Sequence, residues 1–427
     1  MRGHRPERRI IHVSLGRSLG GLPELLRGEM AELARRGVTA RWLSIDVPNR
    51  LGDASAALSD WLHDIEPAVP QDPAQVRAVM AEYGRGQAEG VLRVSRPGDT
   101  VVLHDPMPAS LAPYLPRRRV VWRSHIGAHD AHGGVRQGAL ALDPFLTGVQ
   151  AALFHRHDYA WPGLPAPVVA APPGVNIRSV KHVDLPRSEE RDTTLRTRGV
   201  LPVRCGIREA LVQRPEVLLD DHGTGFLPSP DTPYVVQVSR WDPLKGQLEG
   251  LRLAVPVLAD MPDHHYVLVG PHIRATLMGS TNARVLRSLL DLRGELPPDV
   301  ARRVHVWTFL GPAGCEQWEA VNRLRTGARL VVCPSLREGF GLSVTEAMCR
   351  RATVLASPVG GHLDQIQDGA NGWLARTTGA HWTARLASLL GAGPDPRLGR
   401  SARQSVLDHY TVERSVDRQL ELFGLSP

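Results

Sequence analysis

The side chains best suited to chemistry lie in short glycine-containing runs, each directly after a strand-like stretch. In the second half of the chain, the run Ser239–Gly246 follows the apolar stretch 234–238 and contains Arg240 and Lys245. A planar guanidinium and a compact ammonium could together bind a diphosphate. Lys245 is one of only two lysines in the chain. A solvated surface loop is the alternative interpretation of this run.

A second run, Pro334–Met348, follows another buried-type strand, turns on glycines and enters a helix. It places Glu338 in the loop and Glu346 on the helix. Two acids here could form a glycosidase pair. We favour a different role, in which the acids accept hydrogen bonds from sugar hydroxyls and orient a ligand. A capping acid and a surface acid remain the simpler alternative.

A third run, Gly16–Leu25, follows the first strand of the chain and includes Gly20 and Gly21 at a helix start. Backbone amides at such a helix N-terminus can approach an anionic oxygen closely. The glycines could equally serve only a tight turn. The spacing is not the six-residue dinucleotide fingerprint, so the run gives little support to a nicotinamide enzyme.

These runs need a framework that presents the ends of strands, and the chain alternates short β-rich stretches with helix-patterned segments throughout. The pattern predicts an α/β fold with parallel sheets covered by helices. Strands are expected at 10–15, 40–45, 101–103, 120–122, 151–154, 168–170, 234–238, 266–269, 304–307, 330–333 and 353–356. Helices are expected across 22–33 and 76–91, and near 383–390 and 412–422.

A proline and glycine cluster at 172–176 interrupts the alternation and marks the best domain boundary. Residues 183–233 are rich in charged residues and proline, and we expect irregular structure there with one helix at 207–212. We therefore predict an N-terminal domain over 1–175, a C-terminal domain over 176–405 and a final helical segment over 406–427. Two such α/β halves predict a ligand cleft between domains.

Composition excludes several classes of protein. The 427 residues are 42% hydrophobic and 22% charged, as in ordinary globular proteins, and contain no apolar stretch long enough for a transmembrane helix and no signal peptide. We expect a cytoplasmic protein. The net charge of +7 comes almost wholly from scattered arginines, so nucleic-acid binding is disfavoured. The four cysteines are far apart and are expected to be buried thiols.

The runs Ser239–Gly246 and Pro334–Met348, together with Ser357-Pro358-Val359-Gly360-Gly361, resemble the nucleotide-sugar site of retaining glycosyltransferases of family 4. That family has two Rossmann-like domains in the arrangement called GT-B. The resemblance implies that the N-terminal domain binds the acceptor, that the C-terminal domain binds the nucleotide sugar, and that the last helix, within 406–427, crosses back to the N-terminal domain. In the first half, the runs 104–108 and 122–126 resemble the trehalose glycosyltransferring synthases of the family. Gly127 departs from the synthase pattern, which has an acid there, and puts the identity of the acceptor in doubt.

The resemblance implies a role for each matching position. Arg240 and Lys245 would bind the donor diphosphate, Glu338 the hydroxyls of the donor sugar and Glu346 the nucleotide ribose. His125 would contact the transferred sugar. Main-chain amides around Phe340, Gly341 and Leu342 would complete the cradle for the donor, Gly20 and Gly21 would approach its diphosphate, and His104 and Asp105 would face the acceptor.

We therefore expect a retaining transferase that moves a hexose, glucose by preference, from a nucleoside-diphosphate sugar to a small polar hydroxyl acceptor. With glucose as acceptor the product is trehalose. The alternatives are a natural-product or cyclitol acceptor, and a nucleotide-sugar-binding protein without turnover. The oligomeric state stays open, a homodimer included.

We expect no cofactor and no metal, because the chain has no Asp-x-Asp triplet. Three histidines in one loop, His125, His129 and His132, are the weak alternative for a metal site. Their spacing fits one helical face poorly, and the glycines around them disfavour a helix.

Overall fold

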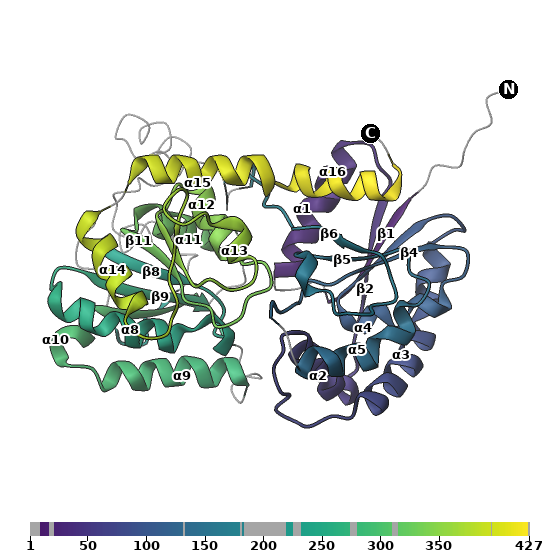
Figure 1. Ribbon diagram of the computed structural model, residues 1–427, viewed down its shortest axis with the longest axis horizontal. Helices are drawn as coiled ribbons and strands as arrows, with labels where there is room; N and C mark the ends of the chain where they lie inside the picture. The colour runs from purple at the N-terminus through teal and green to yellow at the C-terminus, as the bar shows by residue number, and fades with distance from the viewer. Residues whose placement is uncertain are drawn as a thin grey trace. The chain divides into compact units, whose positions relative to one another are not determined.

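The computed structural model describes residues 9–16, 21–130, 133–179, 182, 219–224, 232–273, 280–309, 315–393 and 395–425. Contacts along the chain divide it into two compact units (Figure 1). The first comprises Met1–Val175, Glu338–Phe340 and Tyr410–Pro427, and the second comprises Asn176–Arg337 and Gly341–His409. No helix in the described ranges is long and apolar enough to cross a bilayer.

The first unit is built on a parallel sheet with the order β2-β1-β3-β4-β5-β6. Its strands are β1 (Ile10–Leu15), β2 (Ala40–Ile45), β3 (Thr100–His104), β4 (Arg119–Arg123), β5 (Ala151–Phe154) and β6 (Val168–Ala170). Every residue of β3 and β5 is buried, as expected for strands covered on both faces. Because the strands are parallel, their carboxyl ends lie along one edge of the sheet, where ligands of such folds bind.

Helices cover both faces of this sheet. The described helices are α1 (Gly21–Arg35), α2 (Gly52–Leu62), α3 (Pro73–Val94), α4 (Pro106–Ala109), α5 (Gly133–Leu146) and α16 (Val412–Phe423), with single turns η1 (Asn49–Leu51), η2 (Ala112–Tyr114) and η3 (His157–Tyr159). Successive side chains of a strand point to opposite faces. Ile11 accordingly joins the core that contains residues of α2, α3 and α5, and Ile10 joins the core shared with α1 and α16.

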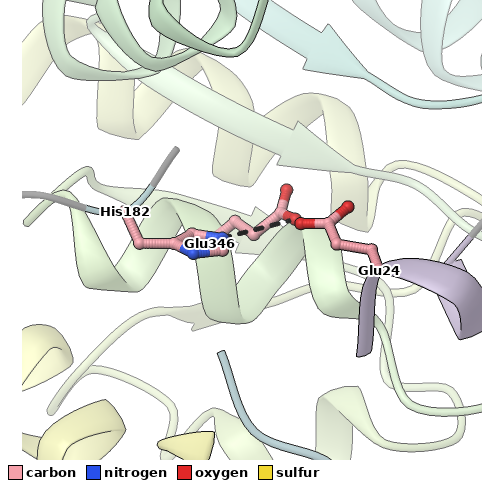
Figure 2. A group of neighbouring side chains, drawn as sticks. All are labelled: Glu24, His182 and Glu346. Atoms are coloured by element: carbon pink, nitrogen blue, oxygen red, sulfur yellow. Dashed lines mark ion pairs between the residues drawn. The ribbon is translucent and has the colours of Figure 1, made fainter. Parts of the chain in front are cut away.

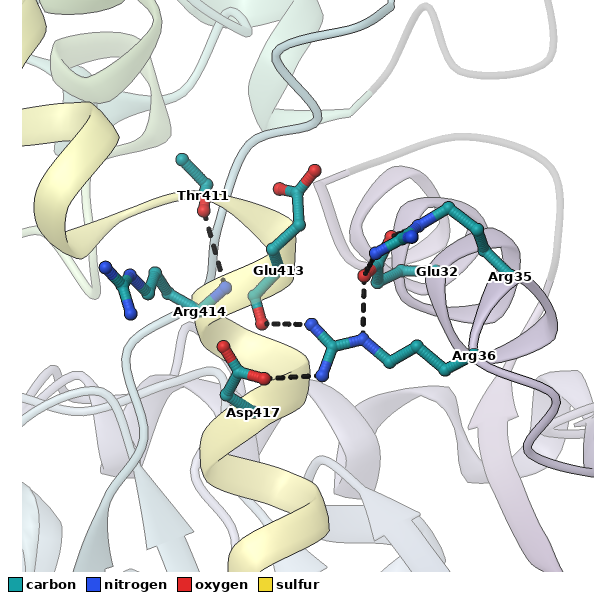
Figure 3. A network of polar contacts seen from close by, with 7 residues as sticks. All are labelled: Glu32, Arg35, Arg36, Thr411, Glu413, Arg414 and Asp417. Carbon is teal, nitrogen blue, oxygen red and sulfur yellow. Dashed lines mark hydrogen bonds and ion pairs between the residues drawn. The ribbon is translucent and has the colours of Figure 1, made fainter. Parts of the chain in front are cut away.

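The last helix, α16, packs on α1. Its apolar face buries Val416, Leu420 and Phe423, and the Thr411 side chain caps its N-terminus by accepting from the Arg414 amide. Polar contacts flank this apolar seam (Figure 3). Arg36, directly after α1, donates to Glu32 of that helix, to the Glu413 carbonyl and to Asp417.

The second unit has a sheet in the order β13-β12-β11-β8-β9-β10-β7, parallel except for β7. Its strands are β7 (Leu219–Asp220), β8 (Tyr234–Val238), β9 (His265–Pro271), β10 (Val304–Phe309), β11 (Leu330–Cys333), β12 (Val354–Ala356) and β13 (Trp373–Leu374). The described helices are α8 (Gln247–Asp260), α9 (Thr281–Gly294), α10 (Pro298–Ala301), α11 (Cys315–Gly327), α12 (Leu342–Cys349), α13 (His362–Gln365), α14 (His381–Ala392) and α15 (Pro396–His409), with the turn η4 (Pro243–Lys245).

The α/β fold with two parallel sheets is confirmed, and each predicted strand is present with boundaries within two residues. The short strands β7 and β13 were not predicted. β7 lies in the segment expected to be irregular, whereas the helix predicted at 207–212 lies outside the described residues. Of the four cysteines, Cys333 and Cys349 are buried thiols, as expected.

Candidate active site

In the second unit, the loop after β8 presents the cations that the sequence singled out. The Asp242 side chain caps η4 by accepting from the Leu244 amide, at 3.0 Å, and also pairs with Arg240, at 3.1 Å. The Arg240 side chain is 61% exposed. Lys245 ends η4, and its main-chain carbonyl accepts from the Gln237 side chain.

This loop is tied to the loop after the neighbouring strand β11. The Leu336 amide donates to the Leu244 carbonyl, at 2.8 Å. Gly246 has a φ of 62°, and a Cβ atom there would lie 2.0 Å from the Pro334 carbonyl oxygen. Only glycine permits both this backbone conformation and this approach. The close packing brings the loop with Arg240 and Lys245 next to the beginning of the run that contains Glu338.

Helix α12 begins beside the end of β8. Gly341, with a φ of 88°, caps the helix, and Ser343 in its first turn donates to the Val238 carbonyl at the end of β8. The first amides of a helix have no acceptor within the helix, and the helix dipole favours an anion there. The amides at Gly341 and Leu342 therefore lie at the start of a helix that is bonded to the end of β8, the strand that leads into the loop with Arg240 and Lys245.

Glu346 lies on α12 and is buried in an ion-pair network. Arg325 of α11 contacts one carboxylate oxygen at 2.6 Å. The His182 ring nitrogen Nε2 lies 3.7 Å from the other oxygen, and Figure 2 shows this pair. Glu24, drawn in the same figure, belongs to the first unit. A carboxylate held by a guanidinium is fixed in orientation. Neither Arg325 nor His182 was predicted, because nothing in their local sequence distinguishes them.

In the first unit, four histidines form a continuous hydrogen-bonded chain across four neighbouring strands. His12 lies within β1, His104 ends β3, and His125 and His155 follow the ends of β4 and β5. Nδ1 of His12 lies 2.9 Å from Nε2 of His104, and Nδ1 of His104 lies 2.9 Å from Nε2 of His125. Nδ1 of His125 then lies 3.3 Å from Nε2 of His155. Both ring nitrogens of His104 and of His125 are thus occupied by neighbouring rings. Neither ring has a nitrogen left for a ligand.

Burial keeps these rings uncharged. It lowers the pKa of His12 to about 4 and that of His155 to about 3, and lowers the pKa of His104 and of His125 well below the usual value. The buried Arg123 guanidinium lowers all four further. Arg123 itself donates to both oxygens of Glu29, at 2.9 and 3.0 Å, and holds the pKa of that carboxyl below its usual value against the opposing effect of burial.

Asp105 joins the ends of β3 and β4. Its carboxylate accepts from the His125 amide at 3.0 Å, and its carbonyl accepts from the Trp122 indole. Its φ of 68° lies in the left-handed region, which is strained for a residue with a side chain. Burial raises the pKa of Asp105 to about 6, although the bond from His125 opposes the shift.

The segment Glu338–Phe340 packs within the first unit. The Tyr159 hydroxyl contacts the Glu338 carbonyl at 3.0 Å and the Gly339 carbonyl, and the Phe340 ring meets the His155 ring edge to face. A Cβ atom on Gly339 would lie 3.0 Å from the His125 carbonyl oxygen. The Phe340 side chain, around which the donor cradle was predicted, is therefore buried. The Glu338 side chain is half-buried.

Gly127, where the sequence departs from the synthase pattern, has a structural explanation. A Cβ atom at this position would lie 2.2 Å from the Tyr159 ring. The missing side chain makes room for the tyrosine that holds the Glu338–Phe340 segment. An acid at 127 is incompatible with this position of Tyr159.

The remaining sequence candidates are placed as follows. Gly21 begins α1 and is exposed, whereas Gly20 lies outside the described residues. His129 pairs with Asp130 at 2.9 Å, and His132 also lies outside the described part of the chain. The histidines that do come together, His12 and His155 with the predicted His104 and His125, are far apart in sequence. The signal that could have found them is a histidine within β1 and at or just after the ends of the neighbouring strands β3, β4 and β5.

Two parts of the chain match known protein families. Residues 310–400 match the family described as glycosyl transferases group 1, and residues 12–161 match the N-terminal domain of trehalose synthase. The trehalose synthase of Pyrococcus horikoshii is 26% identical over 98% of this chain and 90% of its own length, and that of Thermococcus litoralis is 23% identical with the same coverage.

Solved structures show the same fold. An E. coli protein described as trehalose-6-phosphate bound with UDP-2-fluoro glucose has a TM-score of 0.72 at 12% identity and covers 98% of this chain and 100% of its own. The trehalose-phosphate synthase of Burkholderia xenovorans, solved with glucose-6-phosphate, has a TM-score of 0.71 at 15% identity over 97% and 100%.

The fold is therefore GT-B, with two Rossmann-like domains, and one segment of the chain matches a glycosyltransferase family. Its relatives over nearly the whole length are trehalose synthases, so the resemblance seen in the sequence is confirmed.

Proposed function

We propose that the protein transfers glucose, with retention of configuration, from a nucleoside-diphosphate glucose to a hydroxyl of a sugar acceptor, and that glucose as acceptor gives α,α-trehalose. The observation that carries the proposal is the pair of joined loops after β8 and β11. They hold Arg240 and Lys245 beside the start of a run that leads through two glycines into α12. Cations and helix amides in this arrangement suit a diphosphate.

The proposed reaction breaks the bond between the anomeric carbon and the diphosphate oxygen. Arg240 and Lys245 stabilise the negative charge that develops on the departing phosphate. The acceptor oxygen attacks from the same face, and its proton passes to a phosphate oxygen of the leaving group. No protein nucleophile and no metal ion are needed for this sequence of steps, because the cations neutralise the leaving group.

Individual residues orient the donor and the acceptor. Glu338 accepts hydrogen bonds from hydroxyls of the donor sugar, and Glu346, fixed by Arg325, accepts from the ribose. Asp105 is assigned to the acceptor because it is a strained carboxylate at a strand end. His125 contributes its main-chain carbonyl rather than its ring, because both ring nitrogens are already bonded.

The nucleotide and the reaction can be tested in two steps. A thermal-shift panel of UDP, ADP and GDP with their glucose conjugates should show one conjugate that raises the melting temperature, since a ligand selective for the folded state stabilises it. Incubation of that conjugate with labelled glucose should then yield labelled trehalose with and without EDTA. A β-configured product would overturn retention, and activity lost in EDTA would overturn the metal-free mechanism.

The role of Glu338 has its own test. We expect Glu338→Ala to lose sugar transfer while binding of the free nucleoside diphosphate is kept, because the carboxylate is assigned to the sugar and not to the phosphates. Calorimetry with the sugar nucleotide and with the free diphosphate separates the two. An equal loss of affinity for both ligands would contradict the assignment.

A second candidate function differs in the acceptor only. The D-inositol 3-phosphate glycosyltransferase of Nocardia farcinica is 35% identical over 42% of this chain. Together with Gly127 in place of the acid of the synthase pattern, this match favours a cyclitol as the competing acceptor. Competition between labelled glucose and labelled inositol for one donor distinguishes the two acceptors.

A further inference from the structure

Two buried glutamines flank the loop 239–246, which carries both cationic residues of the second unit. Gln237 lies in β8, before the loop, and Gln247 begins α8, after it. Gln237 is 2% exposed and Gln247 is 1% exposed. A buried amide is costly unless its polar groups are hydrogen-bonded. The bonds of these two side chains therefore indicate why an amide occupies each position.

Each glutamine donates to the main chain of one cationic residue, across the loop. Gln237 Nε2 lies 2.9 Å from the carbonyl oxygen of Lys245. Gln247 Nε2 donates to the carbonyl oxygen of Arg240 and, at 2.9 Å, to the hydroxyl oxygen of Ser239. The glutamine before the loop is thus bonded to the end of the loop, and the glutamine after the loop is bonded to its start.

The orientation of the Gln247 amide is set by the loop. Its Oε1 is buried with no hydrogen-bond partner among the described residues. Turning the amide over would place Oε1 against the carbonyl oxygen of Arg240, and two acceptors form no hydrogen bond. An unpartnered buried acceptor is destabilising. An apolar side chain of the same length would avoid that cost, but it would make neither of the two bonds to the loop.

Gln237 interrupts the otherwise aromatic and aliphatic strand β8. Its Oε1 accepts from the Tyr266 hydroxyl of β9, at 3.4 Å, so both ends of its amide are bonded. The bonds from Gln237 and Gln247 reach only main-chain oxygens of the two cationic residues. They therefore fix the backbone that carries the charges without neutralising either charge.

We propose that Gln237 positions Lys245, and Gln247 positions Arg240, for binding of the diphosphate of the sugar nucleotide. The inference rests on the proposed function, which assigns both cations to that diphosphate. The glutamines are positioning residues, since they act through the residues whose carbonyls they hold. Charges that are fixed in advance stabilise a leaving group more than charges that must first be ordered.

The effect on the loop can be measured without any ligand. The amides of 244–246 are bonded within the loop, and their hydrogen exchange reports how firmly it is held. Gln237→Met and Gln247→Met keep the length of the side chain and remove its N–H groups. We expect peptides that cover 239–246 to exchange about fivefold faster in each variant at pH 7.5, and peptides from β10 to be unchanged. Unchanged exchange of the loop in either variant overturns the proposal, whatever the substrate.

Catalysis should depend on the same bonds. Gln247→Met removes two bonds to the loop and should lower both kcat and the affinity for the free nucleoside diphosphate about 20-fold. Gln237→Met removes one bond to the loop and should lower both about fivefold. KM for the acceptor should stay at the wild-type value, because the change is confined to the residues that bind the diphosphate. An equal loss of acceptor affinity would show a general structural role and overturn the proposal.

Double substitutions test which cation each glutamine acts through. Gln237→Met should have no further effect on diphosphate affinity in Lys245→Ala, and Gln247→Met should have none in Arg240→Ala. The crossed combinations, Gln237→Met with Arg240→Ala and Gln247→Met with Lys245→Ala, should be additive. Additive effects in the two matched pairs overturn the positioning roles, because each glutamine then acts independently of its cation.

A matched control is Gln419→Met in the first unit. Gln419 is 2% exposed, and its Oε1 is likewise buried without a partner in the described part of the chain. The variant should keep the wild-type kcat and diphosphate affinity, and a loss as large as that of Gln247→Met would contradict a specific role for the loop. Calorimetry uses UDP, ADP and GDP. Failure of wild type to bind any of them overturns the proposed function and the catalytic part of this inference together, while loop exchange still decides whether the glutamines hold the loop.

Discussion

The two units organise their candidate site residues in opposite ways. In the first unit, the polar groups are buried and bonded to one another, with His104 and His125 using both ring nitrogens internally. In the second, the cations lie on loops shaped by left-handed glycines, and the Arg240 side chain is largely exposed. The first arrangement fixes geometry and the second supplies charge. The comparison teaches that loss of one side chain should disturb structure in the first unit and catalysis in the second.

Acid should produce the largest difference between the units. The four chain histidines have native pKa values below that of an unfolded histidine, so the unfolded state binds more protons below about pH 6.5. Their stabilising contribution is complete above pH 6.5 and is lost as pH falls toward about 4, by about 1.4 kcal/mol per histidine per pH unit. Asp105 opposes this loss. Its native pKa is raised, so the native state takes up this one proton at a higher pH than the unfolded state does.

Hydrogen exchange measured at pH 7.5, 6.5 and 5.5 tests this expectation. Peptides from β1, β3, β4 and β5 should lose protection more steeply than peptides from β8 and β9. The second unit is an internal control with fewer such groups, since burial lowers the pKa of His264 and of His265 there. Equal slopes in the two units would show that the chain histidines are not neutral in the native state.

Substitution of Lys245 should have the largest effect on catalysis. We expect Lys245→Ala to lower kcat/KM about 100- to 1000-fold, about 3–4 kcal/mol, because a positioned cation is lost from the charge that develops on the leaving group. The measurement is steady-state transfer at varied donor concentration. Arg252→Ala, at an exposed position on α8, is the matched control and should be near wild type. Near-native turnover of Lys245→Ala with saturating donor would remove the second unit's role as supplier of charge.

Sequence and structure agree where the signal is local. Runs rich in aliphatic residues such as Ile10–Leu15 predict strands because such strands bury side chains on both faces. The two-residue strands β7 and β13 are too short to show any period. The loops after β8 and β11 were predicted together because motif and resemblance covered both.

The histidine chain could not be predicted from spacing, because its members come from four strands and their order in the sheet is needed to connect them. The sequence search compared His125 with its near neighbours His129 and His132 instead. Proximity in space arises from sheet order, not from distance along the chain. The reason for glycine at 127 could not be predicted either, since the Tyr159 ring that a side chain there would meet is 32 positions away in the sequence.

Gly127→Asp tests packing in the first unit. The new side chain would overlap the Tyr159 ring, so we expect a loss of about 1–3 kcal/mol of unfolding free energy, as for other overpacked sites. Urea unfolding measures it. Gly133→Ala is the control, because a Cβ atom there meets nothing within 4 Å. Unchanged stability of Gly127→Asp would mean that Tyr159 can leave its bonds to Glu338 and Gly339 at no cost.

The smallest effect is expected where α16 meets α1 at the surface. Asp417 is about half exposed, and its ion pair with Arg36 is open to solvent on one side (Figure 3). Asp417→Asn should therefore cost only about 0.5 kcal/mol, and less in 1 M salt, because exposed pairs are weak and screened.

Ser415→Ala, on the same helix, provides the contrast. Its hydroxyl donates to the buried Glu29 carboxylate at 2.9 Å, and removal of a bond to a buried charge should cost about 1.5–3 kcal/mol independent of salt. If urea unfolding shows a larger loss of unfolding free energy for Asp417→Asn than for Ser415→Ala, the helix is held by its surface ion pairs. The buried network of Glu29 and Arg123 would then not be what organises the first unit.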